Sequence, residues 1–178
     1  GRFAPHFHLP LQNASDRVLQ AMRRPYSRGY YQRLVDMIRG RISHAGIGSD
    51  LVVGFPGETA EDFEENVEYL SASPLTYLHV FPYSDRPGTD ASGLAAKVDG
   101  KTVRERARAI RVVGSELAAR FRMSQLGTIR PALTIDGGRI AVTDNYLKVR
   151  IQVSQPENQR VRVRIISAGE PPTGELIA

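Results

Sequence analysis

The apolar residues of the first hundred positions form short continuous runs that alternate with stripes of helical spacing. The run FHLPLQ at 7–12 predicts a short strand. A helix follows that Ser15 or Asp16 caps and that Pro25 ends, because proline lacks the amide that a helix interior requires. Ser27 caps a second helix. The first unit is therefore one strand with two helices.

The strand-and-helix rhythm then repeats. The stretch IGSDLVVGF at 47–55 contains a continuous apolar run, which is typical of a parallel strand buried on both faces. Thr59 caps the next helix, and Asp62 at the third helical position forms a capping box with it. A third strand begins in TYLHVFPYS at 76–84. Strands that alternate with helices predict an α/β fold whose parallel sheet has at most three strands, too few for a complete barrel.

The pattern changes near residue 125. A connection at 85–100 is rich in Pro, Gly, Ser and Asp, and Thr102 with Glu105 predicts the capping box of a long helix. Beyond Gly127 short apolar segments predict strands at 128–135, 139–143, 145–153, 160–167 and 175–177. Such a series is typical of a small all-β barrel of the OB type. We therefore expect two domains, 1–125 and 126–178.

The composition limits the chemistry of the chain. Its 178 residues include no cysteine, which excludes disulfides and any thiolate-bound zinc ion or iron–sulfur cluster made by this chain alone. No apolar run approaches the roughly 18 residues of a membrane span, so none is expected. The sequence lacks an initial methionine and enters a strand pattern almost at once, so we expect an internal fragment of a longer protein.

Charge is spread unevenly along the chain. Residues 1–100 hold 10 Lys+Arg and 12 Asp+Glu, a net charge of −2, whereas residues 101–178 hold 14 and 7, a net charge of +7. The second half is therefore the part expected to contact a polyanion. A solvated basic surface with no partner is the alternative.

Basic residues in the second half recur at every other position, so they project from one face of a strand. An aromatic side chain beside them can stack on a base, and a phosphate backbone would neutralise the cations. Ordinary solvent-facing positions are the alternative interpretation. The candidate RNA-binding residues are Tyr146, Lys148, Arg150, Arg160, Arg162 and Arg164.

Polar and glycine residues follow the predicted parallel strands at their carboxyl ends, where ligands bind in open α/β sheets. Glycine permits close approach of a backbone to a ligand, and a carboxylate can accept from a ribose hydroxyl. These features favour a nucleotide-like ligand, although such turns also use glycine for their geometry alone. The candidates are Gln12, Asp50, Gly54, Gly57, Glu58, Phe81, Tyr83 and Ser84.

Other chemistries find less support. The turn GFPGET lacks the lysine of a phosphate-binding P-loop, and the chain has neither a G-x-S-x-G elbow nor an H-E-x-x-H helix. His6 and His8 share a strand face and could bind a metal, but the sequence offers no third ligand in reach. His79 alternates with apolar residues, which indicates a core or cleft histidine.

Taken together, these stretches resemble the radical S-adenosylmethionine methylthiotransferases that modify tRNA. The matching segments are HLPLQNASDRVLQAMRRPYS, DLVVGFPGETAEDFEE, HVFPYSDRPGT and VTDNYLKVRI, in the family's order. HVFPYS and TDNYLKV are most similar to the branch that acts on threonylcarbamoyladenosine at tRNA position 37. The resemblance implies that 1–125 is the C-terminal half of a partial radical (β/α) barrel and that 126–178 is a TRAM domain.

The resemblance also implies an activity for the full-length protein. It would add a methylthio group to C2 of the modified adenosine by radical chemistry, using S-adenosyl-L-methionine and [4Fe–4S] clusters. The family's cluster-binding cysteines would precede Gly1, so the fragment itself is expected to be inactive. The expected partner is tRNA, and the expected location is cytoplasmic.

Family roles carry over to residues of this chain. Gln12 and Arg24 would hold the methionyl end of S-adenosylmethionine, with Arg24 paired to its carboxylate. Asp50 would accept from the ribose hydroxyls. Asn13 and Ala14 stand where the family more often has Ser and Gly, which changes the flexibility of that turn. The residues implied to flank the adenosine are Gly54 to Glu58 and Phe81 to Tyr83.

Two other functions remain open. The chain could be a stand-alone RNA-binding module without catalysis, or part of a different radical S-adenosylmethionine enzyme, such as a relative of the anaerobic coproporphyrinogen oxidases. An exposed edge of the short sheet would allow self-association in any of these cases.

Overall fold

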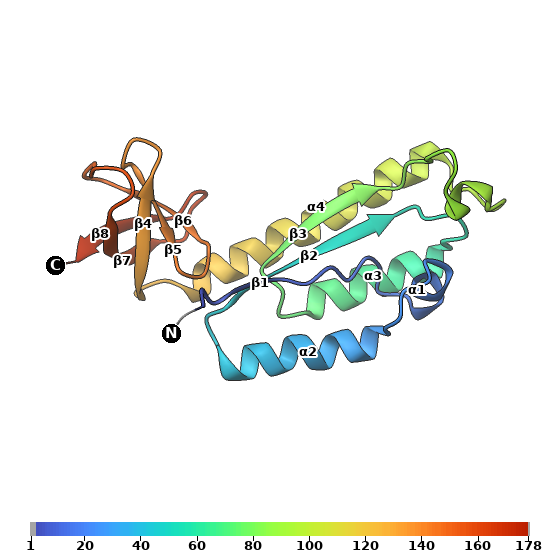
Figure 1. Cartoon of the computed structure of the whole chain (residues 1–178), viewed down its shortest axis with the longest axis horizontal. Helices are drawn as coiled ribbons and strands as arrows, with labels where there is room; N and C mark the ends of the chain where they lie inside the picture. Colours follow the sequence, from blue (N-terminus) through green and yellow to red (C-terminus); the bar gives the residue numbers. More distant parts are fainter. Residues whose placement is uncertain (1–2, 178) are drawn as a thin grey trace. The chain divides into compact units, whose positions relative to one another are not determined.

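The computed structural model describes residues 3–177, which divide into two compact units. The α/β unit comprises His8–Arg41 and Ile47–Leu117. The barrel unit comprises the described residues up to Phe7, then Ile42–Gly46, and those from Ala118 onward. The ribbon of each unit can be followed by its labels in Figure 1.

A three-stranded sheet contains β1 (His6–His8), β2 (Gly46–Val53) and β3 (Tyr77–Pro82), in the order β1-β2-β3. β2 and β3 are parallel, and a parallel bridge joins Gln12 to Leu51. The predicted α/β fold with a parallel sheet of three strands is therefore confirmed.

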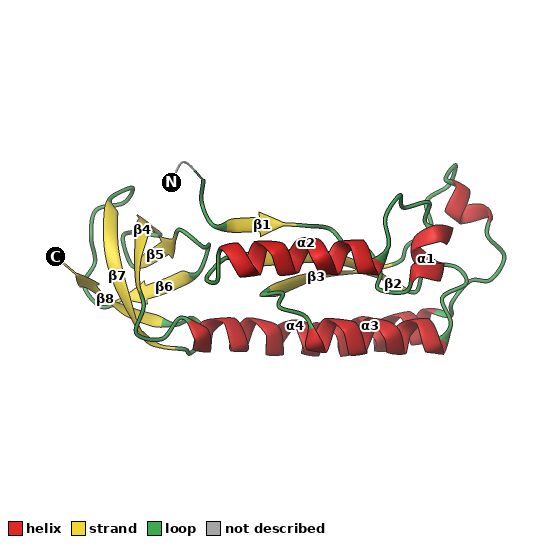
Figure 2. Ribbon diagram, turned by 90° about the horizontal axis from the view of Figure 1, so that it is seen from below, coloured by secondary structure: helices red, strands yellow, loops and turns green. Residues whose placement is uncertain are grey.

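The helices include α1 (Asp16–Ala21), α2 (Arg28–Arg41), α3 (Ala60–Ala72), the 3₁₀ turn η1 (Asp90–Gly93) and α4 (Gly100–Ser124). α3 and α4 lie on the same side of the strands in Figure 2. We call this side of the sheet the covered face. Its β2 side chains are Ile47, Ser49, Leu51 and Val53, all at most 1% exposed.

The opposite side of the sheet, which we call the open face, is much less buried. It carries Asp50 and Val52 of β2, both partly exposed, and His79 and Phe81 of β3, both exposed. The continuous apolar run of β2 predicted burial on both faces, and this is wrong for the residues that alternate with the buried ones. A sheet packed on one side only leaves its second face available to a ligand or to another part of a protein.

Local capping explains where α2 and α3 begin. The side chain of Thr59 accepts from Asp62 N, and the Asp62 carboxylate accepts from Thr59 N, so the predicted capping box is confirmed. The predicted Ser27 cap is confirmed by its Oγ, which accepts from Tyr30 N at 3.2 Å. Ser15 occupies the N-cap position of α1, but its hydroxyl makes no cap hydrogen bond and donates instead to Asp62.

The start predicted for the long helix at Thr102 is wrong. α4 begins at Gly100, because Asp99 caps it: its Oδ1 accepts from Lys101 N at 2.9 Å and from Thr102 N at 3.0 Å. Thr102 lies inside the first turn of α4, and its hydroxyl donates to the same carboxylate.

The barrel unit contains a closed barrel of five strands in the order β4-β5-β6-β8-β7. Its core consists of alternating inward residues, Ala132, Ala141, Val149, Ile151, Val163 and Ile165. The predicted small all-β barrel and its five strands are confirmed, with shifts of a few residues at some ends. The strands are β4 (Ile129–Ile135), β5 (Ile140–Thr143), β6 (Lys148–Ile151), β7 (Arg160–Ser167) and β8 (Thr173–Ile177).

None of the helices within residues 3–177 is both long and apolar enough to cross a lipid bilayer.

Candidate functional site

A hollow of about 410 Å³ opens at the carboxyl ends of the strands in the α/β unit, and we call it the strand-end hollow. Its volume lies within the range of about 300–1,000 Å³ that is usual for small-molecule sites. It combines two cationic side chains with apolar and aromatic walls. The lining residues are Gln12, Ala21, Met22, Arg23, Arg24, Val52, Phe55, Tyr83, Asp90, Ala91 and Leu94.

Gln12 is held at the rim of this hollow by the sheet. Its N–H donates to Asp50 O and its carbonyl accepts from Val52 N, both at 2.8 Å. Its φ is +71°, a left-handed conformation that costs a non-glycine residue roughly 1–2 kcal/mol. Strained residues of this kind concentrate at functional sites, so the observed geometry favours a role for this side chain in binding.

Two adjacent arginines line the same hollow, and they differ in their partners. The Arg23 guanidinium donates to the carboxylate of Asp90 in η1. Arg24 forms no ion pair within the described residues, and its backbone N–H donates to Leu19 O at the end of α1. Arg24 is therefore the cation that remains available to an anionic group of a ligand.

Aromatic rings form another wall of the hollow. Phe55 and Tyr83 meet edge to face, with ring centroids 5.6 Å apart. The Tyr83 hydroxyl donates to Asp85 at 2.7 Å, which fixes the outer end of its ring. Sequence reasoning did not single out Phe55 individually, although an aromatic residue inside a strand-end turn was a usable signal.

The turn after β2 has a structural network of its own. Glu58, whose side chain is fully buried, accepts from Gly54 N at 3.2 Å, from Arg106 Nη1 at 2.6 Å and from Asn13 Nδ2 at 3.3 Å. Burial raises the pKa of Glu58 above its ordinary value, although these hydrogen bonds and the Arg106 charge oppose the shift. Neither Glu58 nor Gly54 lines the strand-end hollow.

Gly54 is required by packing. Its φ is +76°, and a Cβ at this position would lie 2.4 Å from Val103 Cγ2 in α4.

Phe81, half exposed on the open face, does not line the hollow either. Of the residues predicted individually to bind the cofactor, the structure therefore brings Gln12, Arg24 and Tyr83 to one hollow.

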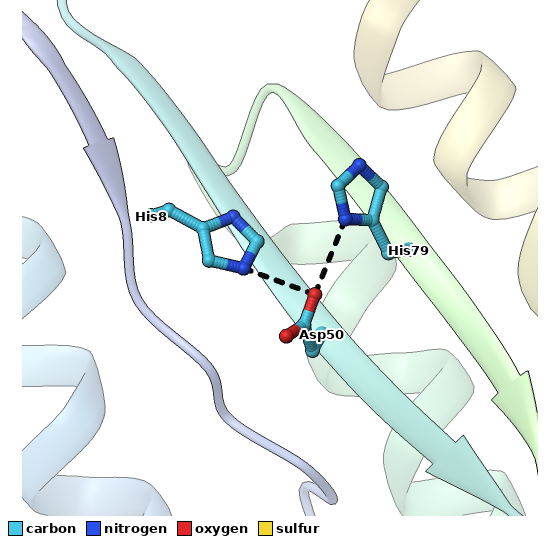
Figure 3. Close-up of side chains that lie close together, drawn as sticks. All are labelled: His8, Asp50 and His79. Carbon is cyan, nitrogen blue, oxygen red and sulfur yellow. Dashed lines mark ion pairs between the residues drawn. The ribbon is translucent and has the colours of Figure 1, made fainter.

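Asp50 lies further from the carboxyl ends of the strands than the hollow does. Its carboxylate is close to the side chains of two histidines (Figure 3). Its Oδ1 is 3.0 Å from His8 Nε2 and 3.3 Å from His79 Nδ1. The expectation that His8 has no third ligand in reach is therefore wrong. His6, by contrast, stacks on Tyr146 within the barrel unit, with centroids 4.5 Å apart.

The barrel unit presents the basic residues that the sequence singled out, and all five cations are exposed. β8 lies between β6 and β7, so the two basic strands are not neighbours and their charges are not directly opposed. Arg164 is paired with Glu175 of β8 at 2.9 Å. Arg160 and Arg162 form no ion pair within the described residues, so they are the strand β7 cations available to phosphate.

A groove of about 760 Å³ crosses the outside of the barrel beside these cations, and we call it the barrel groove. Leu133 of β4 pairs with Val142 of β5 on one side and with Arg160 of β7 on the other, and Val142 in turn pairs with Lys148 of β6. This cross-strand row has an apolar centre and a cation at each end. Tyr146, 61% exposed, lines the same groove.

Comparison with known proteins gives a consistent family of relatives. The chain is 38% identical over 92% of its length to a threonylcarbamoyladenosine tRNA methylthiotransferase of Aquifex aeolicus, of which it covers 40%. It is 35% identical over 97% of its length to a tRNA-2-methylthio-N(6)-dimethylallyladenosine synthase of Mycobacterium marinum, of which it covers 32%. A Treponema pallidum threonylcarbamoyladenosine tRNA methylthiotransferase is 34% identical over 94% of the chain. No protein-family model matches the chain.

Proposed function

Because the chain is a homologue of the tRNA methylthiotransferases and spans about two fifths or less of the length of these relatives, we propose that it is part of such an enzyme. The whole protein would attach a methylthio group to C2 of a modified adenosine at tRNA position 37. The α/β unit would bind S-adenosylmethionine, and the barrel unit would bind tRNA. In this proposal the α/β unit is the C-terminal half of a partial radical S-adenosylmethionine (β/α) barrel. The barrel unit is a TRAM domain.

The observation that carries the cofactor part of the proposal is the convergence of Gln12, Arg24 and Tyr83 on the strand-end hollow. A guanidinium without an acidic partner suits the methionyl carboxylate. The Phe55 and Tyr83 rings and Val52 offer an apolar wall to an adenine. S-adenosylmethionine, when bound, would supply the radical and the methyl group, while these residues bind and orient it.

The iron–sulfur clusters of such an enzyme do not fit this chain. Their ligands are thiolates, and the sequence has no cysteine. Any cluster would be held by other parts of the whole protein, and we propose that the chain alone does not transfer the methylthio group.

The barrel part of the proposal is supported by Arg160, which forms no ion pair within the described residues, and by the exposed ring of Tyr146, since both line the barrel groove. Arg160 and Lys148 end the cross-strand row described above, and Tyr146 lines the same groove. Phosphate contacts of this kind are independent of sequence and weaken as salt concentration rises. Stacking on Tyr146 would add a contact to an unpaired base.

The cofactor assignment is tested by nuclear magnetic resonance titration of the chain with S-adenosylmethionine, a method suited to weak binding. We expect shift changes at Gln12, Arg24 and Tyr83, lost in Arg24→Ala and retained in Arg41→Ala, an exposed arginine outside the hollow. Shift changes confined to other surfaces would overturn the assignment. Binding of tRNA without any binding of S-adenosylmethionine would favour a stand-alone RNA-binding module.

A further inference from the structure

We infer that His8, Asp50 and His79 form a binding site for a divalent transition-metal ion on the open face of the sheet (Figure 3). The site is separate from the strand-end hollow, which none of the three residues lines. It also goes beyond the proposed function, since neither S-adenosylmethionine nor tRNA is required to occupy it.

The fold brings the three side chains together from three neighbouring strands. Asp50 of β2 and His79 of β3 are register partners, so their side chains project from the same face. His8 ends β1 on the other side of β2, where Leu9 N donates to Gly48 O. One ligand atom from each residue lies within 4.8 Å of the other two.

The separations from Asp50 Oδ1 to the two histidine nitrogens match those between ligands of one metal ion. With metal–ligand bonds of about 2.0–2.2 Å, two ligands of a tetrahedral ion lie about 3.4 Å apart, and adjacent ligands of an octahedral ion lie about 3 Å apart. Asp50 Oδ1 is 3.0 Å from His8 Nε2 and 3.3 Å from His79 Nδ1. A single ion could therefore contact all three atoms after small side-chain rotations.

The hydrogen-bonding capacity of the Asp50 carboxylate is also not fully satisfied. Its Oδ1 is buried and has no hydrogen-bond partner within the described residues, so the two close imidazole nitrogens do not donate to it in good geometry. A buried carboxylate oxygen without a donor is costly, and a bound cation removes that cost. The cluster is thus better explained as a set of ligands than as a hydrogen-bonded triad.

Surrounding residues orient one of the histidines as a ligand. His8 Nδ1 lies 3.3 Å from the Tyr77 hydroxyl, which leaves Nε2 directed toward Asp50. An outer hydrogen bond of this kind fixes the tautomer of a metal-binding histidine. Tyr77 reaches this position because residue 48 is glycine: a Cβ there would lie 1.9 Å from the Tyr77 ring.

The ligand set indicates which ion would bind. Two imidazoles and one carboxylate suit Fe²⁺, Co²⁺, Ni²⁺ or Zn²⁺, whereas Mg²⁺ and Ca²⁺ prefer oxygen ligands alone. Three protein ligands leave at least one position for water or another ligand, as in catalytic rather than structural zinc sites. His79, with 56% of its side chain exposed, keeps that position accessible from the open face.

The test is titration of the purified 178-residue chain with Co²⁺, followed by visible absorption, and with Zn²⁺ in competition. We expect one equivalent of Co²⁺ to bind with d–d bands in the visible, Zn²⁺ to displace it, and millimolar Mg²⁺ to have no effect. His8→Ala, Asp50→Asn and His79→Ala should each weaken binding roughly tenfold or more. His6→Ala is the matched control on the same strand and should bind like the wild type.

Circular dichroism of each variant checks that the fold is kept, and Tyr77→Phe provides a milder change that removes only the hydroxyl. We expect Tyr77→Phe to weaken Co²⁺ binding less than loss of a ligand does, with unchanged stoichiometry. Absence of a visible band in the wild type, or an unchanged affinity in folded Asp50→Asn, would overturn the inference. Failure of S-adenosylmethionine binding would leave this result untouched, so the two proposals fail independently.

Discussion

Arg106 of α4 donates from Nη1 to Glu58 Oε1 at 2.6 Å, and both side chains are nearly inaccessible, 11% and 0% exposed. The same carboxylate accepts from Gly54 N in the turn after β2. One buried ion pair therefore ties α4 to the turn that borders the strand-end hollow. Removing one partner of such a pair is costly because the other charge stays buried.

We expect Glu58→Ala to lower the free energy of unfolding by about 3–5 kcal/mol, the range for breaking a buried ion pair. Urea unfolding followed by far-ultraviolet circular dichroism measures the change. Glu64→Ala, an exposed glutamate on α3, should change stability far less. Equal effects of the two substitutions would show that the Arg106 contact contributes nothing specific.

The ionised carboxylate of Asp62 is expected to make the free energy of unfolding depend on pH. Burial opposes its ionisation, but hydrogen bonds from Arg17, Ser15 and Thr59 outweigh burial and hold the pKa of Asp62 well below its usual range. A depressed pKa contributes stability that is present above the unfolded-state pKa of about 3.9 and is lost as pH falls below it. Asp62→Asn should therefore lower stability near neutral pH by about 1–3 kcal/mol and weaken its acid dependence.

Urea unfolding at a series of pH values from neutral to well below the ordinary aspartate pKa of about 3.9 checks this. The control is Glu68→Gln, an exposed carboxylate on the same helix, which should leave the profile unchanged. A wild-type profile retained in Asp62→Asn would assign the acid dependence to other groups.

We expect Arg160 and Arg162 to contribute more to binding of tRNA phosphates than Arg164 does. Arg160→Ala with Arg162→Ala should weaken tRNA binding by the chain and flatten the slope of log affinity against log salt by about 1 for each lost contact. Arg164→Ala should have a smaller effect, because Glu175 already neutralises that guanidinium. Filter binding at several salt concentrations measures the slopes, and a slope unaltered in the double variant would refute the RNA face.

Base stacking should depend on the ring of Tyr146. Tyr146→Ala should weaken binding of single-stranded RNA by about 1–3 kcal/mol, whereas Tyr146→Phe keeps the ring and should bind nearly as well as the wild type. Both variants retain a Cβ at the φ of +71°, so the backbone cost at this position is unchanged. Fluorescence anisotropy measures the affinities, and equal losses in the two variants would point to the hydroxyl rather than to stacking.

The sequence predicted the fold from local patterns, and those patterns were sufficient for most elements. Strand β7 was predicted at its observed bounds, because inward Val163 and Ile165 alternate with outward arginines. The start of α4 was missed because two residues, Asp99 and Thr102, both carry cap-forming oxygens, and only the structure shows which one accepts from the backbone.

The candidate sites depend on relationships between strands that the sequence does not contain. Gln12 and Tyr83, which the strand-end pattern singled out, line one hollow together with Arg24, which only the resemblance singled out. Asp50 stands three residues before the end of β2, so it meets His8 and His79 instead of lining that hollow. That meeting requires the register of β1, β2 and β3, which follows from tertiary packing and not from any local pattern.

The unpaired edge of the three-stranded sheet at β3 affects the behaviour of the chain in solution. Within the described residues β3 pairs with β2 alone, so the peptide groups along its outer side have no strand opposite them. An unpaired strand edge of this kind pairs with a strand of another chain. We expect the apparent mass of this chain in analytical ultracentrifugation to rise with concentration, and an attached segment that extends the sheet past β3 to abolish that rise.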